Sequence, residues 1–313
     1  MKPPVKGGAA VASAASGLWL GLLGVAIFAL TLPMTRLAVG DAVAPQLSPP
    51  FVTIGRAAVA GILSLGYLMA VGARPPARPL WAALLVCAAG TVLGFPLGLA
   101  LALREVPAMH AAVLTGVLPL ATAVVAALWL RQRASTGFWL CASLGSAVVL
   151  AFAALAGDGR LHRADGFLLL AIGSAAIGYV AGARVSQVLA AQQTIAWVLV
   201  LSLPLTLPFA LWLAPWQHWQ LVAWPAWLGF GYVSVFSMWL GFFAWYRALA
   251  LGGVMRVSQV QLLQPFLSLL LAAPLLGEPL ELRTLGFTLA VMAIVFVGQR
   301  MPVHAAAKKR ELT

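Results

Sequence analysis

The chain has 313 residues, of which 63% are hydrophobic and only 8% are charged. An average soluble domain carries about 25% charged residues, so this composition excludes an ordinary soluble fold and indicates a multi-span membrane protein. The net charge of +12 comes from basic residues scattered between apolar runs, which excludes a basic face for binding nucleic acid.

Ten apolar segments are predicted to be transmembrane helices, each of which needs about 20 residues. They are residues 17–39, 51–71, 80–103, 107–130, 136–156, 166–185, 193–213, 224–249, 257–276 and 284–300. Proline, charge or both mark most of the gaps, and no gap is long enough for a soluble domain. Small residues precede the first apolar run instead of following it, so we expect a retained helix and not a cleaved signal peptide.

The distribution of basic residues predicts the orientation of the chain. With ten spans and a cytoplasmic N terminus, thirteen of the 19 Lys and Arg residues fall on the cytoplasmic side and six on the other. This asymmetry follows the positive-inside rule. We therefore predict a multi-pass protein of the inner membrane, with the N-terminal segment 1–16 and the basic tail 301–313 both in the cytoplasm.

The two halves of the sequence show a weak internal duplication. A shift of 146 residues places Trp81 on Trp227 and Pro119 on Pro265. Ten helices then divide into two units of five, and an odd number of helices gives the units opposite orientations. Such inverted repeats are typical of secondary transporters, which bind their substrate near the midplane between the two units.

The predicted fold is therefore an all-α integral membrane protein, with ten transmembrane helices arranged as two inverted five-helix repeats around a central cavity. The first repeat is predicted over residues 17–156 and the second over residues 166–300, with a linker at 157–165. The alternative explanation of the internal duplication is chance similarity between two segments rich in leucine and alanine.

Several motifs resemble a known family. Residues 116–130 and 254–298, the latter with Gln264-Pro265 and Gly277-Glu278, resemble the EamA-type repeats of the drug/metabolite transporter superfamily. Arg56, which opens the predicted second helix after a proline, adds to this resemblance. The resemblance covers nearly the whole chain, although the first half has Arg131-Gln132 where the second has Gly277-Glu278.

This resemblance implies a ten-helix fold in which helices 1, 3, 4, 6, 8 and 9 surround the cavity. It also implies export of small metabolites, commonly amino acids. Because the motifs are diffuse, they indicate the superfamily far better than the substrate.

Polar side chains at helical spacing mark the predicted fourth and ninth helices as candidate substrate-binding elements. They are Ser258, Gln261, Gln264 and Ser268 on the ninth helix, and Thr115 and Thr122 on the fourth. Pro119 and Pro265 each free a carbonyl one turn earlier and are candidate kink sites for gating. The alternative role of such polar groups is hydrogen bonding between helices.

The predicted eighth helix carries an aromatic face. Helical spacing places Trp239, Phe242, Phe243 and Tyr246 on one side of it. Of these, Trp239, Phe243 and Tyr246 are candidate substrate contacts, because an aromatic wall suits apolar, aromatic or cationic groups. Core packing or lipid contact is the alternative.

Two arginines near helix ends are the last candidates. Arg36 ends the first predicted helix and Arg184 the sixth, and each could attract a substrate carboxylate. Each could equally extend to the lipid headgroups.

The absence of other motifs limits the function. No Asp or Glu lies in the middle of a predicted span, and no metal-binding, hydrolase or nucleotide-binding motif is present. We therefore predict a non-enzymatic exporter or facilitator of amino acids or related zwitterionic or neutral compounds, without a cofactor. Its expected partners are a small-molecule substrate and the lipid bilayer, with no nucleic acid, and a homo-oligomer is left open. The alternatives are a multidrug or cation exporter of the same superfamily, an intramembrane enzyme or lipid-modifying protein, and a non-transporting scaffold.

Overall fold

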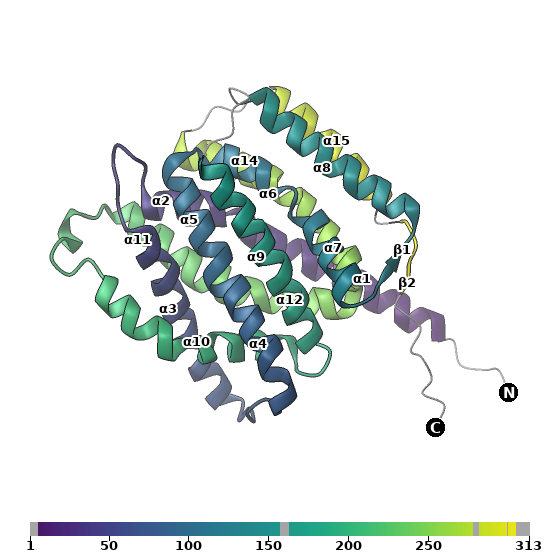
Figure 1. Cartoon of the computed structure of the whole chain (residues 1–313), viewed down its shortest axis with the longest axis horizontal. Coiled ribbons are helices and arrows are strands. Elements are labelled where there is room, and N and C mark those ends of the chain that lie inside the picture. The colour runs from purple at the N-terminus through teal and green to yellow at the C-terminus, as the bar shows by residue number, and fades with distance from the viewer. Residues whose placement is uncertain (1–5, 157–162, 278–281, 299, 305–313) are drawn as a thin grey trace.

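A computed structural model describes residues 6–156, 163–277, 282–298 and 300–304 of the chain. The described chain is almost entirely helical, and its helices pack side by side (Figure 1). Seven described helical stretches are long and apolar enough to cross a membrane, and two shorter apolar helices accompany them. The protein is therefore a multi-pass membrane protein.

The first half of the chain is built from helices of varied type. Its α-helices are α1 (Lys6–Ala29), α2 (Thr31–Val39), α3 (Pro49–Ala70), α4 (Trp81–Cys87), α5 (Phe95–Glu105), α6 (Ala108–Thr115), α7 (Leu118–Trp129) and α8 (Thr136–Ala156). The 3₁₀ turn η1 (Arg78–Leu80) precedes α4, and the π-helical segment η2 (Ala88–Gly94) joins α4 to α5.

The second half has a similar order of elements. Its α-helices are α9 (Arg163–Val185), α10 (Ala191–Leu213), α11 (Trp224–Tyr232), α12 (Gly241–Gly252), α13 (Val254–Ser258), α14 (Gln264–Leu276) and α15 (Leu282–Gly298). The 3₁₀ turn η3 (Trp219–Leu221) precedes α11, the π-helical η4 (Val233–Leu240) joins α11 to α12, and the 3₁₀ segment η5 (Gln259–Leu263) joins α13 to α14. Several spans expected as single α-helices therefore change helix type midway.

Proline residues mark the points at which two of the spans pass from one helical segment to the next. Pro119 and Pro265 occupy the second position of α7 and α14, where a missing N–H breaks no helical hydrogen bond. At Pro265, the expected free carbonyl is satisfied locally, because the backbone N–H of Gln264 donates to the carbonyl of Gln261. The kink is therefore a tightened 3₁₀ turn, and that carbonyl is not an exposed polar group.

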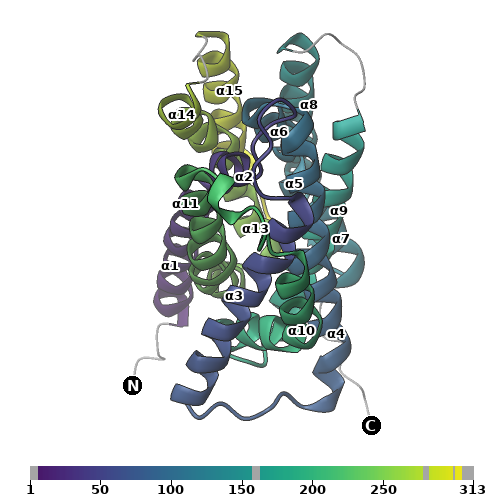
Figure 2. The same cartoon turned by 90° about the vertical axis from the view of Figure 1, so that its left-hand side faces the viewer.

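The described part of the molecule has two ends. At one, the short strands β1 (Arg133–Ala134) and β2 (Val303–His304) pair antiparallel; we call this the strand end (Figure 1, right). At the other, the connection 40–48 links α2 to α3, and we call this the Asp41 end (upper left). The connection between α3 and α4 lies at the bottom of Figure 2, on the side of the strand end.

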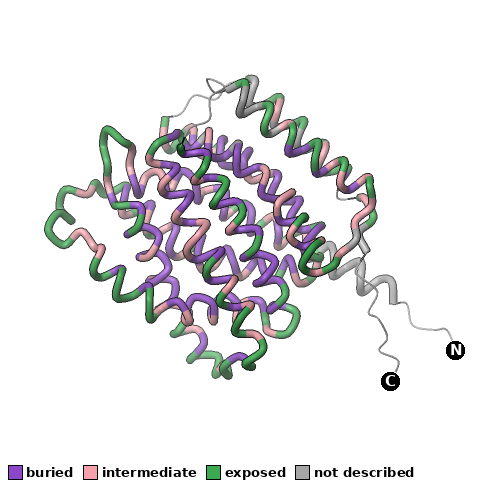
Figure 3. Tube along the Cα trace, in the orientation of Figure 1, coloured by how far each residue is buried: buried purple, intermediate pink, exposed green. Residues whose placement is uncertain are grey.

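Helices from the two halves of the chain pack against one another throughout the bundle. α3 lies along α10 (Figure 2), and α8 lies along α15 at one edge (Figure 1). α1 packs on α12 and α2 on α11, while α9 packs on α4, η2 and α5. α6 contacts α14, and α7 contacts α13. The buried residues gather in the middle of this arrangement (Figure 3).

The outward faces suit a lipid environment. They carry exposed leucine, valine and tryptophan side chains, such as Leu128 at 77% exposure. Trp212, Trp216, Trp219 and Trp224 are all exposed toward the Asp41 end, where an aromatic belt at the membrane interface is expected.

Small residues allow α9 to approach the α4–η2–α5 rod closely. A Cβ built on Gly90 would lie 2.4 Å from the carbonyl oxygen of Ser174, and one on Gly178 would lie 2.9 Å from the backbone nitrogen of Thr91. Side chains at these points would separate the helices, so glycine is required by packing.

We predict that Gly178→Ala lowers the melting temperature of the purified protein, because the new methyl group meets backbone atoms of η2. Overpacking of this kind costs about 1–3 kcal/mol. The control is Gly173→Ala on the same helix, where no atom lies within 4 Å of the added Cβ and alanine favours the helix. Equal melting temperatures for the two variants would contradict the proposed close contact.

Candidate functional site

A buried arginine lies inside the bundle. Arg56 is on α3, about 10 Å along the helix axis from its first residue, and is only 2% exposed. An arginine side chain remains protonated in proteins, and placing one at the centre of a membrane helix costs about 2.5–3.5 kcal/mol on insertion scales. Such a residue indicates a functional site.

The carboxylates of the described residues do not neutralise this charge. Asp41 and Asp165 pair with other bases, and Glu105 is exposed at the last residue of α5. Within the part of the chain that the structure describes, the titratable group near Arg56 is the phenol of Tyr179, which carries no charge at neutral pH. The guanidinium is therefore held by neutral groups.

One hydroxyl group from another helix contacts Arg56, and a second hydroxyl contacts the first. Its Nη2 donates to Oγ of Ser237 on η4 at 2.9 Å. That Oγ lies 2.8 Å from Oγ1 of Thr31, the first residue of α2. The Nε of Arg56 is buried and has no hydrogen-bond partner. Three helices thus meet at a charge whose hydrogen-bonding capacity is only partly used.

Gln261 on η5 is a second buried polar group with unused capacity. Its side chain is 2% exposed, and neither its amide nitrogen nor its amide oxygen makes a hydrogen bond of normal geometry. It lies beside the hydroxyl of Tyr179 on α9. An unsatisfied buried group costs about 1–3 kcal/mol, which a bound polar solute would remove.

We call Thr31, Arg56, Tyr179, Ser237 and Gln261 the central polar cluster. Its members come from α2, α3, α9, η4 and η5, which belong to both halves of the chain. Together they present a cation, hydroxyls and an amide inside an apolar bundle, and can hydrogen-bond one small polar solute.

Aromatic rings adjoin this cluster. Phe28 lies 5.1 Å from Phe242 and 6.1 Å from Trp245, measured between ring centroids. Tyr179, which belongs to the central polar cluster, lies 5.7 Å from Trp245. The buried Nε1 of Trp245 has no hydrogen-bond partner. The rings form one apolar wall beside the polar groups.

The aromatic face expected on the eighth span is divided in the structure. Phe242 and Tyr246 are buried toward α1 and α9, whereas Trp239 and Phe243 are half-buried, with Phe243 packed on Tyr67 of α3 at 5.3 Å. Phe242, Phe243 and Tyr246 all lie in α12, and at about 100° per residue the four side chains spread over an arc of about 100°. Phe242 and Tyr246 fall on the buried side of this arc, and Trp239 and Phe243 fall on its half-buried side.

Two candidate side chains on α14 bond to the backbone of the first span. The hydroxyl of Ser268 donates to the carbonyl of Ala29 at 2.7 Å, and the amide of Gln264 donates to the carbonyl of Phe28 at 3.4 Å. The Ala29 carbonyl is the one that Pro33, lacking an N–H, cannot satisfy. These side chains join α14 to the break between α1 and α2.

Three other candidates make no hydrogen bond to another helix in the described part of the chain. The hydroxyl of Ser258 donates to the carbonyl of Met255 at 3.1 Å, and that of Thr115 donates to the carbonyl of Ala111 at 2.9 Å. Thr122 on α7 is fully buried, and its hydroxyl has no partner. Thr122 is thus the member of this set with hydrogen-bonding capacity to offer.

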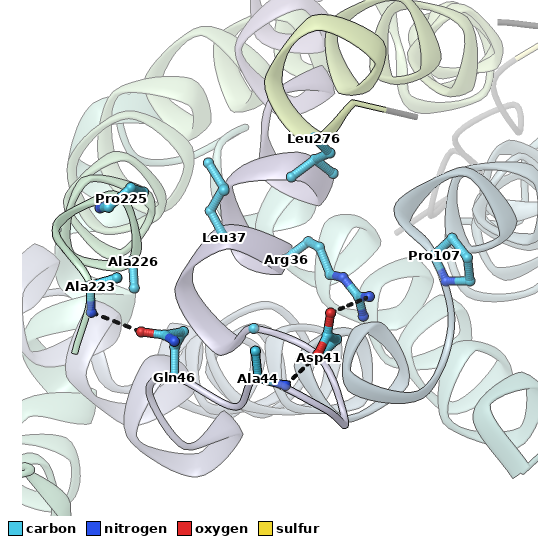
Figure 4. A pocket seen from close by; sticks show the side chains of 11 residues that line it. Arg36, Leu37, Asp41, Ala44, Gln46, Pro107, Ala223, Pro225, Ala226 and Leu276 are labelled. Atoms are coloured by element: carbon cyan, nitrogen blue, oxygen red, sulfur yellow. Dashed lines mark hydrogen bonds and ion pairs between the residues drawn. The ribbon is translucent and has the colours of Figure 1, made fainter. Parts of the chain in front are cut away.

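Arg36 lies at the Asp41 end and lines a pocket of about 460 Å³ (Figure 4). Its Nη1 donates to the carbonyl of Leu103, and its Nη2 lies 3.6 Å from Oδ2 of Asp41. These contacts tie α2 to the end of α5. Arg184 is exposed at the last turn of α9, near the strand end, so the structure does not bring the two arginines together.

Backbone hydrogen bonds shape the carboxylate of this pocket. The N–H of Ala44 donates to Asp41 and lowers its pKa; partial desolvation opposes this, while the N–H of Val43 and the charge of Arg36 add to the lowering. A lowered pKa means that Asp41 remains ionised, and pairs with Arg36, at a lower pH than an ordinary aspartate would. Gln46 accepts a hydrogen bond from the N–H of Ala223, which closes the same pocket.

Arg56 is not among the site residues predicted from the sequence. From the sequence it is a charge near a helix end and one of the six basic residues on the non-cytoplasmic side, but its burial in the bundle removes it from that count. The signal was present, because Arg56 lies five residues inside an otherwise apolar predicted span. Asp165 was likewise taken as a loop acid, yet it lies 2.7 Å from His110 and joins α9 to α6.

Comparison with known proteins identifies the family. The family model described as the EamA-like transporter family matches residues 15–154 and 162–298. The chain belongs to the EamA-like transporter family. It is therefore a membrane transporter of the drug/metabolite transporter superfamily and not an enzyme.

Individual relatives agree with this assignment. The chain is 44% identical over 283 residues to a Bacillus subtilis (strain 168) protein named uncharacterized transporter YdeK, covering 90% of this chain and 96% of that protein. A solved crystal structure with 17% sequence identity superposes with a TM-score of 0.68 over 91% of this chain and 98% of the other. That structural likeness supports the fold alone.

We predict that Ser268→Ala destabilises this EamA-like protein. Loss of the hydroxyl leaves the buried Ala29 carbonyl without its donor, at a cost of about 1–3 kcal/mol. The matched control is Ser64→Ala on α3, because the buried Ser64 hydroxyl has no partner to lose. Thermal unfolding in detergent should show a lower melting temperature for the first variant alone; an unchanged value would mean that the bond does not hold the break in place.

Proposed function

We propose that the protein is a secondary carrier that moves amino acids or related zwitterionic or neutral metabolites by alternating access. The observation that carries this proposal is the central polar cluster, a set of buried and incompletely bonded polar groups where helices of both halves meet. A scaffold without transport would have no need to bury polar groups at such a cost.

The packing of the helices supports an inverted repeat. The chain would have ten spans in two repeats, in which spans 1 to 5 correspond to spans 6 to 10. Exchanging the halves turns the contact of α6 with α14 into that of α7 with α13, and the contact of α1 with α12 into that of α9 with α5. The contacts of α3 with α10 and of α8 with α15 map onto themselves. A pseudo-twofold axis in the membrane plane predicts this pattern.

Positions within the helices agree with the same relationship. The first residues of α7 and α14, Leu118 and Gln264, are separated by the sequence shift of 146. The same shift superposes the π-helical segments η2 and η4. Arg36 and Arg184 differ by 148, and that shift places Thr31 on Tyr179, so two members of the central polar cluster are equivalent. We therefore propose repeats over 17–156 and 166–300.

The described acids favour facilitated diffusion or exchange. Asp41 lies in a connection, Glu105 ends α5, and Asp165 is in the first turn of α9. A carrier coupled to protons or sodium ions commonly has a carboxylate in the middle of the membrane, and the described residues offer none there.

We propose that the protein spans the inner membrane with its strand end facing the cytoplasm. In a variant without native cysteines, we predict that Val43→Cys, at an exposed position of the Asp41 end, reacts with a membrane-impermeant maleimide in intact spheroplasts. Arg74→Cys, in the connection between α3 and α4, should react only after permeabilisation. Labelling of both, or of Arg74→Cys alone, in intact spheroplasts would contradict this orientation.

Transport is tested with purified protein in proteoliposomes loaded in turn with labelled amino acids. We predict saturable efflux of one or more of them, and a loss of about tenfold or more in Gln261→Leu, which cannot hydrogen-bond the solute. Its expression and melting temperature should not fall, since neither atom of the amide makes a hydrogen bond of normal geometry with the described residues.

Gln264→Leu serves as the matched control, because the Gln264 amide bonds to the backbone of Phe28. Its transport and stability should decline together. Parallel losses in Gln261→Leu would indicate a structural role for that residue, and no saturable flux of any compound in the panel would count against the carrier function.

A further inference from the structure

The central polar cluster has more hydrogen-bond donors than acceptors. A guanidinium has five N–H groups, and the structure gives that of Arg56 one protein acceptor, the Ser237 hydroxyl. Its Nε–H is buried without a partner. The cluster thus has at least one strong donor that no group of the described residues satisfies.

The hydroxyls add a further donor. Ser237 and Thr31 have two hydroxyl hydrogens between them but share one hydroxyl–hydroxyl hydrogen bond. Whichever of the two donates in that bond, one hydrogen is left. The amide nitrogen of Gln261 makes no hydrogen bond of normal geometry with the described residues either. Whatever occupies this site must therefore accept hydrogen bonds.

The net charge of the site indicates that the acceptor is an anion. Arg56 is always protonated, is 2% exposed, and has no carboxylate of the described residues beside it. A buried charge is costly unless it is paired. The cluster contains one cation, so a single negative charge would neutralise it.

We propose that Arg56 binds the carboxylate of the transported solute, with the Ser237–Thr31 hydroxyl pair as additional donor. This proposal rests on the proposed carrier function and narrows it to carboxylate-bearing solutes. A guanidinium can hold a carboxylate through two parallel hydrogen bonds, and such charge-assisted bonds are about twice as strong as neutral ones.

The neighbouring groups suit the rest of such a solute. The unpartnered amide oxygen of Gln261 can accept a hydrogen bond from an ammonium or amine group next to the carboxylate. The rings of Phe28, Tyr179 and Trp245 can cover an apolar side chain. A purely cationic solute is disfavoured, because it would have to enter beside an unneutralised arginine.

The test measures binding by thermal shift of the purified protein, so it does not depend on transport. The probes are an equimolar mixture of neutral L-amino acids and, separately, the same compounds as carboxamides, which lack the negative charge. We expect the amino acids to raise the melting temperature and the carboxamides to have no effect. Inorganic phosphate is the third probe, because it too binds guanidinium groups.

The variants separate binding from structure. Arg56→Gln should weaken amino-acid binding by about 10- to 100-fold, while the melting temperature without ligand stays equal or rises, because an unpaired buried charge has been removed. Arg56→Lys keeps the charge and should retain part of the binding. Arg247→Gln on α12 removes an exposed arginine and should bind like the wild type.

Three results would overturn the assignment. They are equal stabilisation by the amino acids and the carboxamides, stronger stabilisation by phosphate than by the amino acids, and a fall in the ligand-free melting temperature of Arg56→Gln with unchanged amino-acid binding. Proteoliposome flux distinguishes the two proposals: saturable wild-type flux that carboxamides inhibit as well as amino acids would retain the carrier and exclude the carboxylate site. Binding without flux would retain the site and count against the carrier.

Discussion

A positive charge kept away from water, and away from any described negative charge, is the constraint on which the centre of this protein depends. The cost of placing Arg56 inside an apolar bundle is reduced only in part by one hydroxyl acceptor. The four elements that supply the polar neighbours of Arg56, namely α2, η4, η5 and α9, each contribute an uncharged polar side chain. The site is therefore incomplete without a ligand, which is a useful property in a carrier.

The packing that brings these elements together relies on small residues. Gly90 and Gly178 place η2 against α9 so closely that no side chain fits between them. In a membrane, where lipid is as apolar as leucine, such close contacts and the few hydrogen bonds between helices hold the bundle together. The bonds of Ser268 and Gln264 to the first span are of this kind, whereas Gln261, on the same rod, keeps its amide unpaired.

Much of the fold follows from features that a sequence displays directly. Lengths of apolar runs indicated the membrane spans, and Pro119 and Pro265 indicated where two rods change. The site was harder to predict, because spacing along one helix does not show which part of its arc faces the core. Phe242 and Tyr246 are buried, whereas Trp239 and Phe243 on the same arc are half-buried. The carbonyls that bond Ser268 and Gln264 lie more than 200 residues away in sequence. The importance of Arg56 depends on the absence of a described carboxylate beside it, and a local sequence pattern does not show this.

The break at Pro33 has a kinetic consequence. The shift that pairs Arg36 with Arg184 places Pro33 on Ala181, near the end of the continuous helix α9. The first span of one half is thus broken into two helices, α1 and α2, whereas the first span of the other half is the continuous helix α9. In the alternating-access carrier proposed above, the two halves would move with unequal stiffness, so the half-saturation constants measured on the two faces of the membrane should differ. Without an energy source, the maximal rates must differ in the same proportion, so that no gradient is created.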